Sequence, residues 1–136
     1  MLIISWNCSG AFRKKCKQII EYDCDIMIIQ ECENPNEVEY PKEFKICMPN
    51  YIWVGDNKNK GLAVFSKHKL KDNLWDSGGN KYFISCRVSD GFHILGVWCH
   101  YANSPTFGYI GQMWKYLKLN KDNIRDKDII IGGDFN

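Results

Sequence analysis

The sequence predicts an α/β fold that combines a parallel crossover with antiparallel strands in one domain, residues 1–136. Two observations predict it. Near-continuous apolar runs at 24–31 and 127–136 are typical of strands buried on both faces of a sheet. Between them, short apolar runs alternate with clusters of Gly, Asn, Asp and Lys, which is typical of antiparallel strands joined by turns. The 136 residues, 45% of them hydrophobic, suffice for one core and exclude a disordered chain.

The first third of the chain is predicted to form a strand, a helix and a second strand. Residues 2–7 are a short β-branched run, and residues 24–31 form the buried strand. Residues 11–23 between them carry an apolar helical face, formed by Phe12, Cys16, Ile19 and Ile20. Two strands joined through a helix are expected to lie parallel.

The rest of the chain is predicted to be mainly antiparallel. Strands are expected at 51–56, 61–67, 82–90 and 92–101, with the Ser-Asp-Gly-Phe run at 89–92 as a hairpin turn. A helix is expected after the Ser-Pro pair at 104–105, because apolar residues recur at helical spacing: Ile110, Met113, Trp114 and Leu117. On this pattern Trp114 belongs to the core. The final run is predicted to be a buried strand that leads into a glycine turn.

Composition limits the classes of function. The net charge of +2, from 18 basic and 16 acidic residues, neither requires nor excludes nucleic acid. No apolar run reaches the roughly 18 residues of a membrane span, so no membrane association is expected. Seven cysteines without a signal peptide predict reduced thiols and a cytoplasmic location. Four cysteines are spaced eight apart but match no common zinc spacing, so we interpret the pattern as coincidence. No obligate protein partner is evident.

Polar side chains follow the predicted strands at the ends where loops converge on sites in sheet proteins: Asn7, Glu31, His100, Asp134 and Asn136. Carboxylate and amide oxygens are ligands that Mg²⁺ prefers. A bound Mg²⁺ would polarise a phosphoryl oxygen, a carboxylate would orient an attacking water, and Asn and His would donate hydrogen bonds to phosphate. The residues therefore suggest phosphoester hydrolysis.

Five strings in the same order strengthen this hypothesis: SWNCSG, IIQE, KGLAVFSK, WCHY and IIIGGDFN. From residue 3 to residue 136 the chain resembles the endonuclease/exonuclease/phosphatase superfamily, the fold of pancreatic DNase I and the exonuclease III-type abasic-site nucleases. The resemblance implies a DNase I-like four-layer αββα sandwich. It also implies Mg²⁺-dependent hydrolysis of phosphodiesters, with Mn²⁺ as a possible substitute and nucleic acid, DNA in particular, as the partner.

The resemblance implies a role for each site residue. Glu31 would be the principal Mg²⁺ ligand, and Asn7 would help to bind metal or phosphate. Asp134 would contribute to the metal site and activate the attacking water, while Asn136 would hold the scissile phosphate. His100 falls at the position of a catalytic His, and its neighbour Tyr101 leaves that alignment open by one position. Gly132 and Gly133 would form the turn that brings backbone close to substrate.

One family motif has no counterpart in the sequence. Members carry an Asp-His pair near the C-terminus of a longer domain, and the chain ends at Asn136 without it. We therefore expect the chain to be the N-terminal portion of the domain, about half to two-thirds of it and incomplete at the C-terminus.

Several alternatives stay open. The enzyme could hydrolyse a small-molecule or lipid phosphoester, or the chain could be a catalytically inactive fragment that binds nucleic acid or a partner. A run of lysines could follow a phosphate backbone, but a solvated face that blunts strand edges is the preferred interpretation: Lys58, Lys60, Lys67, Lys69 and Lys71. Tyr109, Trp114 and Tyr116 could offer stacking surfaces for bases, although Trp114 is better explained as core.

Overall fold

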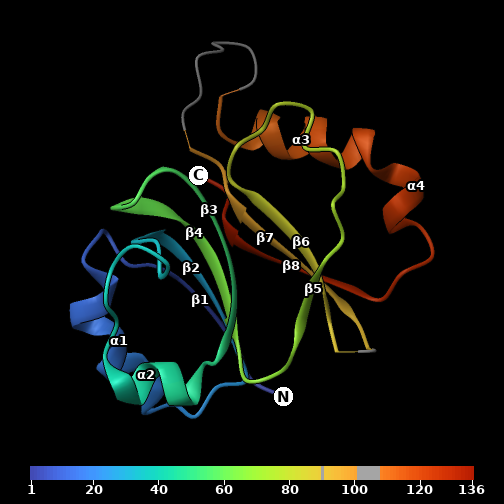
Figure 1. Cartoon of the computed structure of the whole chain (residues 1–136). Coiled ribbons are helices and arrows are strands. Elements are labelled where there is room, and N and C mark those ends of the chain that lie inside the picture. The colour runs from blue at the N-terminus through green and yellow to red at the C-terminus, as the bar shows by residue number, and fades with distance from the viewer. Residues whose placement is uncertain (90, 101–107) are drawn as a thin grey trace.

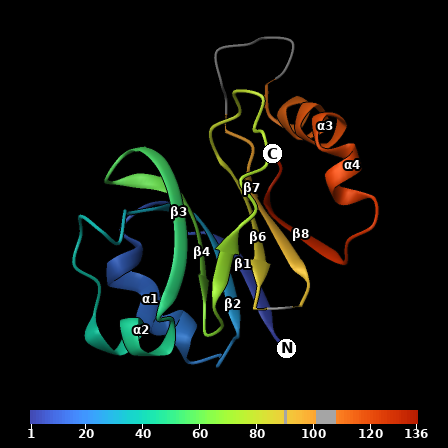
Figure 2. The ribbon, with the colours of Figure 1, turned by 45° about the vertical axis from the view of Figure 1, so that its right-hand side comes forward.

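The computed structural model describes residues 1–89, 91–100 and 108–136. Two four-stranded sheets face each other, and helices cover the outer face of each sheet (Figure 1). Turned by 45°, the same arrangement has α1 and α2 on one side and α3 and α4 on the other (Figure 2). The predicted α/β sandwich of the DNase I-like type is confirmed. None of the described helices is long and apolar enough to span a membrane.

The first sheet contains the predicted crossover. Its strands lie in the order β1-β2-β4-β3, and their bounds are β1 Ile3–Asn7, β2 Ile26–Cys32, β3 Asn50–Asn57 and β4 Lys60–Ser66. Helix α1, Phe12–Ile20, joins β1 to β2, which pair in parallel as expected. Helix α2, Lys42–Cys47, was not predicted, because a single buried residue, Phe44, gives it no periodic pattern.

The second sheet is antiparallel except at one edge. Its strands lie in the order β5-β6-β7-β8, with bounds β5 Leu70–Asp72, β6 Phe83–Val88, β7 His93–Trp98 and β8 Ile129–Asp134. Strands β6 and β7 pair antiparallel, as the predicted hairpin requires, although residue 90 of its turn lies outside the described residues. Strands β7 and β8 pair in parallel. Helices α3, Ile110–Leu119, and α4, Lys121–Ile124, lie between them in sequence.

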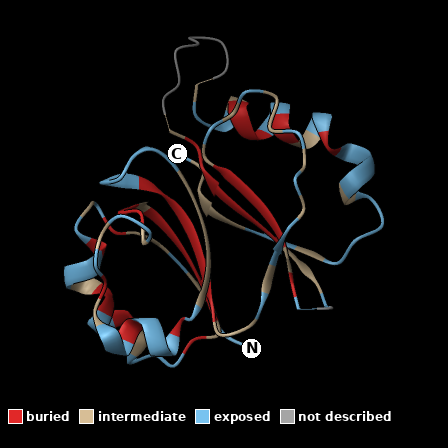
Figure 3. Ribbon diagram, viewed as in Figure 1, coloured by how far each residue is buried: buried red, intermediate tan, exposed pale blue. Residues whose placement is uncertain are grey.

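Alternation along the strands builds three apolar layers, and the central strands of both sheets are mostly buried (Figure 3). On β2, Met27 and Ile29 face α1 and α2, whereas Ile26 and Ile28 face the second sheet. On β7, Ile94 and Trp98 join this layer between the sheets, whereas Leu95 and Val97 face α3. A strand that carries apolar side chains on both faces is therefore central to the sandwich, as predicted for β2.

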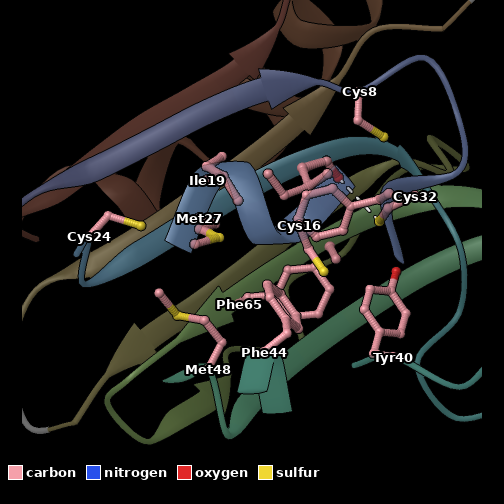
Figure 4. Packing of buried hydrophobic residues seen from close by; sticks show 13 residues of the cluster. Cys8, Cys16, Ile19, Cys24, Met27, Cys32, Tyr40, Phe44, Met48 and Phe65 are labelled. Atoms are coloured by element: carbon pink, nitrogen blue, oxygen red, sulfur yellow. Dashed lines mark hydrogen bonds between the residues drawn. The ribbon is translucent and has the colours of Figure 1, made fainter. Parts of the chain in front are cut away.

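The four cysteines that are spaced eight apart share one layer of the core. Cys8, Cys16, Cys24 and Cys32 all lie buried in the layer between the first sheet and its helices (Figure 4). All seven cysteines of the chain are free. Burial raises the pKa of Cys8 and of Cys16 to about 11, so these thiols are protonated at neutral pH. They act as small apolar core residues.

Strand β8 differs from the prediction of a fully buried strand. It lies at the sheet edge, with Ile130 42% exposed and Ile131 36% exposed. The apolar run is compatible with either position, because periodicity cannot reveal whether a second neighbour is present. Gly132 and Gly133 also lie within the strand, paired with β7, and form no turn after it.

Helix α3 corrects a second prediction. Trp114 is 66% exposed and Ile110 is exposed too, whereas Met113 and Tyr116 are buried. The spacing identified the helix, and Met113 and Leu117 do pack toward the second sheet, but Ile110 and Trp114 were wrongly assigned to the core. Tyr116 stacks on Phe83, with 4.6 Å between ring centroids, and is unavailable to bases.

Because Trp114 contributes little to the core, Trp114→Ser is expected to change the free energy of unfolding by less than about 0.5 kcal/mol. Tyr116→Ala, its matched comparison on the buried face, should cost about 3–5 kcal/mol through the cavity it leaves. Urea denaturation of the two variants measures both. A larger loss in the Trp114 variant than in the Tyr116 variant would contradict this assignment of faces.

Candidate active site

Three of the predicted site residues meet where β1, β2 and β8 end. Asn7 is the last residue of β1 and Asp134 the last of β8, while Glu31 lies one residue before the end of β2. The Asn7 side-chain amide donates to Glu31 Oε1 at 3.2 Å and to Asp134 Oδ2 at 2.8 Å. One NH₂ group therefore holds two carboxylates from different sheets.

A bulge in β2 presents Glu31 to this site. In the ladder with β4, Gln30 pairs with Leu62 and Cys32 pairs with Gly61, which leaves Glu31 as the extra residue. Its φ of 64° lies in the left-handed region, which costs a non-glycine residue about 1 kcal/mol. Gln30 and Cys32, on either side of the bulge, are both buried. The Glu31 side chain between them is 23% exposed and therefore reaches the site. Strain of this kind is frequent at functional positions.

The glycines of β8 bring Asp134 into place by close packing. A Cβ on Gly132 would lie 2.9 Å from Ile28 Cδ1, so a side chain there would have to displace the end of the Ile28 side chain. Gly133 has φ +149°, and a Cβ would come within 1.9 Å of the Val97 carbonyl oxygen. Behind them, the Asp134 carbonyl accepts from the backbone N–H of Cys99 at 2.8 Å, and its Oδ1 accepts from the backbone N–H at position 136.

A lysine and three aromatic rings form the second wall of the site. Lys60 Nζ lies 3.3 Å from Glu31 Oε2 and 5.4 Å from the centroid of the Trp98 ring. Trp98 stacks on His100 with 4.7 Å between centroids, and Tyr82 packs against Trp98 at 4.6 Å. The three rings lie in or beside the second sheet, whereas Lys60 begins β4 of the first sheet, so its ammonium group reaches from one sheet to the other.

The rim beside this wall carries a further link between the sheets. Asp56, near the end of β3, accepts from Lys81 Nζ at 3.1 Å and from the Tyr82 hydroxyl at 3.1 Å. These hydrogen bonds, from Lys81 first and then Tyr82, hold the pKa of Asp56 below its usual value. An open groove of about 470 Å³ runs along the rim; its lining includes Trp53, Gly55, Asp56, Asn80 and Lys81.

The other predicted residues are placed less directly. Asn136 is tied to Asp134 through its backbone N–H, and its side chain is exposed. His100 lies at the same end of the second sheet, two residues after Trp98, and its backbone carbonyl accepts from Gln112 Nε2. Its alternative, Tyr101, lies outside the described residues. The catalytic roles of all these residues stay predictions.

The sequence did not indicate that Lys60 contacts Glu31 and Trp98. It was grouped with four other lysines, but β4 separates them: Lys60 begins the strand, whereas Lys67 lies just past its other end and pairs with Asp23 at 2.6 Å. The lysines therefore do not form one continuous track. A signal that could have separated Lys60 is its place directly before the Gly-Leu-Ala-Val run, beside the strand that carries Glu31.

The donor set fits a hard divalent cation. Glu31 and Asp134 supply two carboxylates within hydrogen-bonding distance of one nitrogen, and Mg²⁺ is often held by one or two carboxylates with water filling the remaining positions. Within the described ranges no three His, Cys, Asp or Glu side chains gather as a zinc site would require. Asn7 Oδ1 accepts from the backbone N–H of Ser9 at 3.1 Å, so in this arrangement Asn7 acts as a donor.

The sequence model of the Endonuclease/Exonuclease/phosphatase family matches residues 4–136, almost the whole chain. The chain belongs to this family. None of the curated protein sequences compared with this family member matches it.

Solved structures agree with the family's fold. The 3′-5′ exonuclease NExo from Neisseria meningitidis superimposes with a TM-score of 0.72 at 20% identity, over 100% of this chain and 58% of its own. The 3′ phosphatase NExo from Neisseria, bound to product DNA hairpin, gives 0.66 at 21% identity over 98% and 57%. An AP endonuclease from Archaeoglobus fulgidus gives 0.65 at 16% identity over 99% and 57%. This family member thus spans less than three-fifths of the length of these structures.

Proposed function

We propose that the protein is a Mg²⁺-dependent phosphodiester hydrolase that acts on nucleic acid, with DNA as the first-choice substrate. The observation that carries this proposal is the contact of Asn7 with both Glu31 and Asp134. These two carboxylates from separate sheets share one NH₂ group, and the Lys60 ammonium pairs with Glu31 alone. Within the described residues no cation pairs with Asp134, so the site carries negative charge that a divalent cation would neutralise. Their arrangement is therefore better explained by a metal site than by stability.

In this proposal Glu31 and Asp134 hold Mg²⁺, for which Mn²⁺ could substitute. When bound, the cation would polarise a phosphoryl oxygen and stabilise the charge that develops there. Asp134 would also orient a water molecule in line with the scissile bond and accept its proton as the water oxygen bonds to phosphorus. The backbone N–H at position 136 restrains the Asp134 carboxylate for this task.

Neutral donors would hold the phosphate. Asn7 would share its NH₂ group between carboxylate and phosphate, and the Asn136 side chain is exposed beside it. The stack of His100 on Trp98 fixes the plane of the imidazole, so a ring N–H could donate to the phosphate or to the leaving oxygen as the P–O bond breaks. Support for DNA comes from one of the similar structures, a 3′ phosphatase bound to product DNA hairpin.

The test is nicking of supercoiled plasmid by the purified chain with Mg²⁺ and with EDTA. A hairpin oligonucleotide with a 3′-phosphate and a soluble inositol phosphate serve as second and third substrates. Nicking that requires Mg²⁺ and is lost in Glu31→Gln is expected. Turnover of the inositol phosphate alone would favour the small-molecule phosphoesterase. If all three substrates stay intact, the chain is not itself a hydrolase, and the inactive binding alternative is supported.

The free thiols of all seven cysteines accord with the cytoplasmic location that we propose. Partition between cytoplasm and exported fractions of expressing cells would test it.

A further inference from the structure

Lys60 lies inside the candidate site without a role in the hydrolysis proposed above. Its Nζ is 3.3 Å from Glu31 Oε2, which belongs to the first sheet, and 5.4 Å from the Trp98 ring centroid, which belongs to the second. The Lys60 side chain is 46% exposed, so it approaches the site from solvent. The hairpin between β3 and β4 carries it, one residue before the buried part of β4.

The partners of Lys60 are weak enough to be exchanged. A half-exposed ion pair contributes little to stability, and a cation over an aromatic ring at this distance adds a comparably small amount. Glu31 is also the residue best placed to bind a divalent cation. A divalent cation on Glu31 would lie only a few ångströms from the Lys60 ammonium and would repel it. Binding of the cation is therefore expected to weaken the Lys60–Glu31 ion pair and to favour release of Lys60.

We propose that Lys60 is a phosphate-binding residue of the substrate complex that is held on Glu31 until a divalent cation takes that carboxylate. Once released, the ammonium group stays within reach of the Trp98 ring, whose centroid lies 5.4 Å away, and Trp98 stacks on His100. The nearest anion is then the phosphate of the substrate. This inference rests on the proposed function, because it needs a cation at Glu31 and a phosphate beside it.

If Lys60 moves from Glu31 to the substrate phosphate, Lys60→Met should change the affinity for Mn²⁺ and the affinity for DNA in opposite directions. Mn²⁺ alone should bind more tightly, by about two- to tenfold, because an exposed ion pair no longer competes for Glu31. DNA should bind more weakly, and the slope of log affinity against log salt should fall by about one, because one phosphate contact is lost. A merely structural role would not move these two quantities in opposite directions.

Mn²⁺ binding is measured by the electron paramagnetic resonance signal of the free ion. DNA binding is measured by fluorescence anisotropy with a phosphorothioate duplex in Mg²⁺. Lys60→Arg keeps the charge and should leave both close to wild type. Lys58→Met removes a charge two residues away, from an exposed side chain with no ion pair among the described residues, and should leave Mn²⁺ affinity unchanged.

Glu31→Gln separates the two proposals. If this variant loses Mn²⁺ binding while Lys60→Met binds Mn²⁺ no tighter than wild type, the inference about Lys60 is overturned and the metal site stands. An unchanged salt slope in Lys60→Met also overturns it. If Mn²⁺ binding is unaffected by either change, the proposed metal site itself is wrong.

Discussion

Asp134→Asn is expected to lower the rate of Mg²⁺-dependent DNA cleavage by about 10²- to 10⁴-fold, the range typical for loss of a general base. The substitution preserves shape, and its Oδ1 can still accept from the backbone N–H at position 136, which lies 3.1 Å away. It removes the negative charge and turns an acceptor into an NH₂ group opposite the Asn7 NH₂, 2.8 Å away. Proton acceptance and cation binding are thus lost together while the fold is retained.

Plasmid nicking at saturating Mg²⁺ gives the rate, and thermal unfolding by circular dichroism confirms the fold. Asp126→Asn is the matched control, since this exposed carboxylate forms no ion pair within the described part of the chain and lies in the loop before β8. Nicking by Asp134→Asn at the wild-type rate, with Asp126→Asn also at that rate, would remove Asp134 from the mechanism.

The sequence was sufficient to predict that Glu31 and Asp134 lie close together, because the order and direction of the strands largely determine where strand ends meet. An apolar run with no polar alternation, such as 26–29, is typical of a strand between two covered faces, so the polar residues that follow it lie toward the end of the strand. Parallel pairing of β1 with β2 brings Asn7 close to Glu31, and packing of β8 on the first sheet, where Gly132 meets Ile28, adds Asp134. Asn7, Glu31 and Asp134 meet for this reason, although 127 residues separate the first from the last.

Contacts between side chains of different sheets could not be predicted from the sequence, because they depend on the direction in which each side chain points. Lys60 resembled its neighbouring surface lysines, and nothing in the local pattern indicates that its ammonium crosses from β4 to a tryptophan on β7. The prediction that Trp114 belongs to the core was wrong for a related reason. Apolar residues occur on both faces of α3, and only the packing of Met113 and Tyr116 against the second sheet shows which face is buried. The bulge at Glu31 likewise depends on pairing with β4.

Gly133→Ala is expected to destabilise the chain by about 3 kcal/mol or more, enough to unfold a domain of ordinary marginal stability. Two costs combine at this position. The φ of +149° is one that residues with a Cβ rarely adopt. The added Cβ would also lie 1.9 Å from the Val97 carbonyl oxygen, 2.7 Å from its carbonyl carbon and 2.9 Å from its nitrogen. All three are backbone atoms of a buried central strand, so none of them can rotate away.

Gly79→Ala separates the two costs. Its φ of +82° is also positive but lies close to the left-handed region, and no heavy atom lies within 4 Å of the added Cβ, so it should lose only about 1 kcal/mol. Urea denaturation measures the difference between the variants. Because β8 holds Asp134 against β7, relief of the clash would move β8 outward and separate Asp134 from Asn7. Equal stability of the two variants would mean that β8 can shift without cost, and the position of Asp134 would then not be fixed by its pairing with β7.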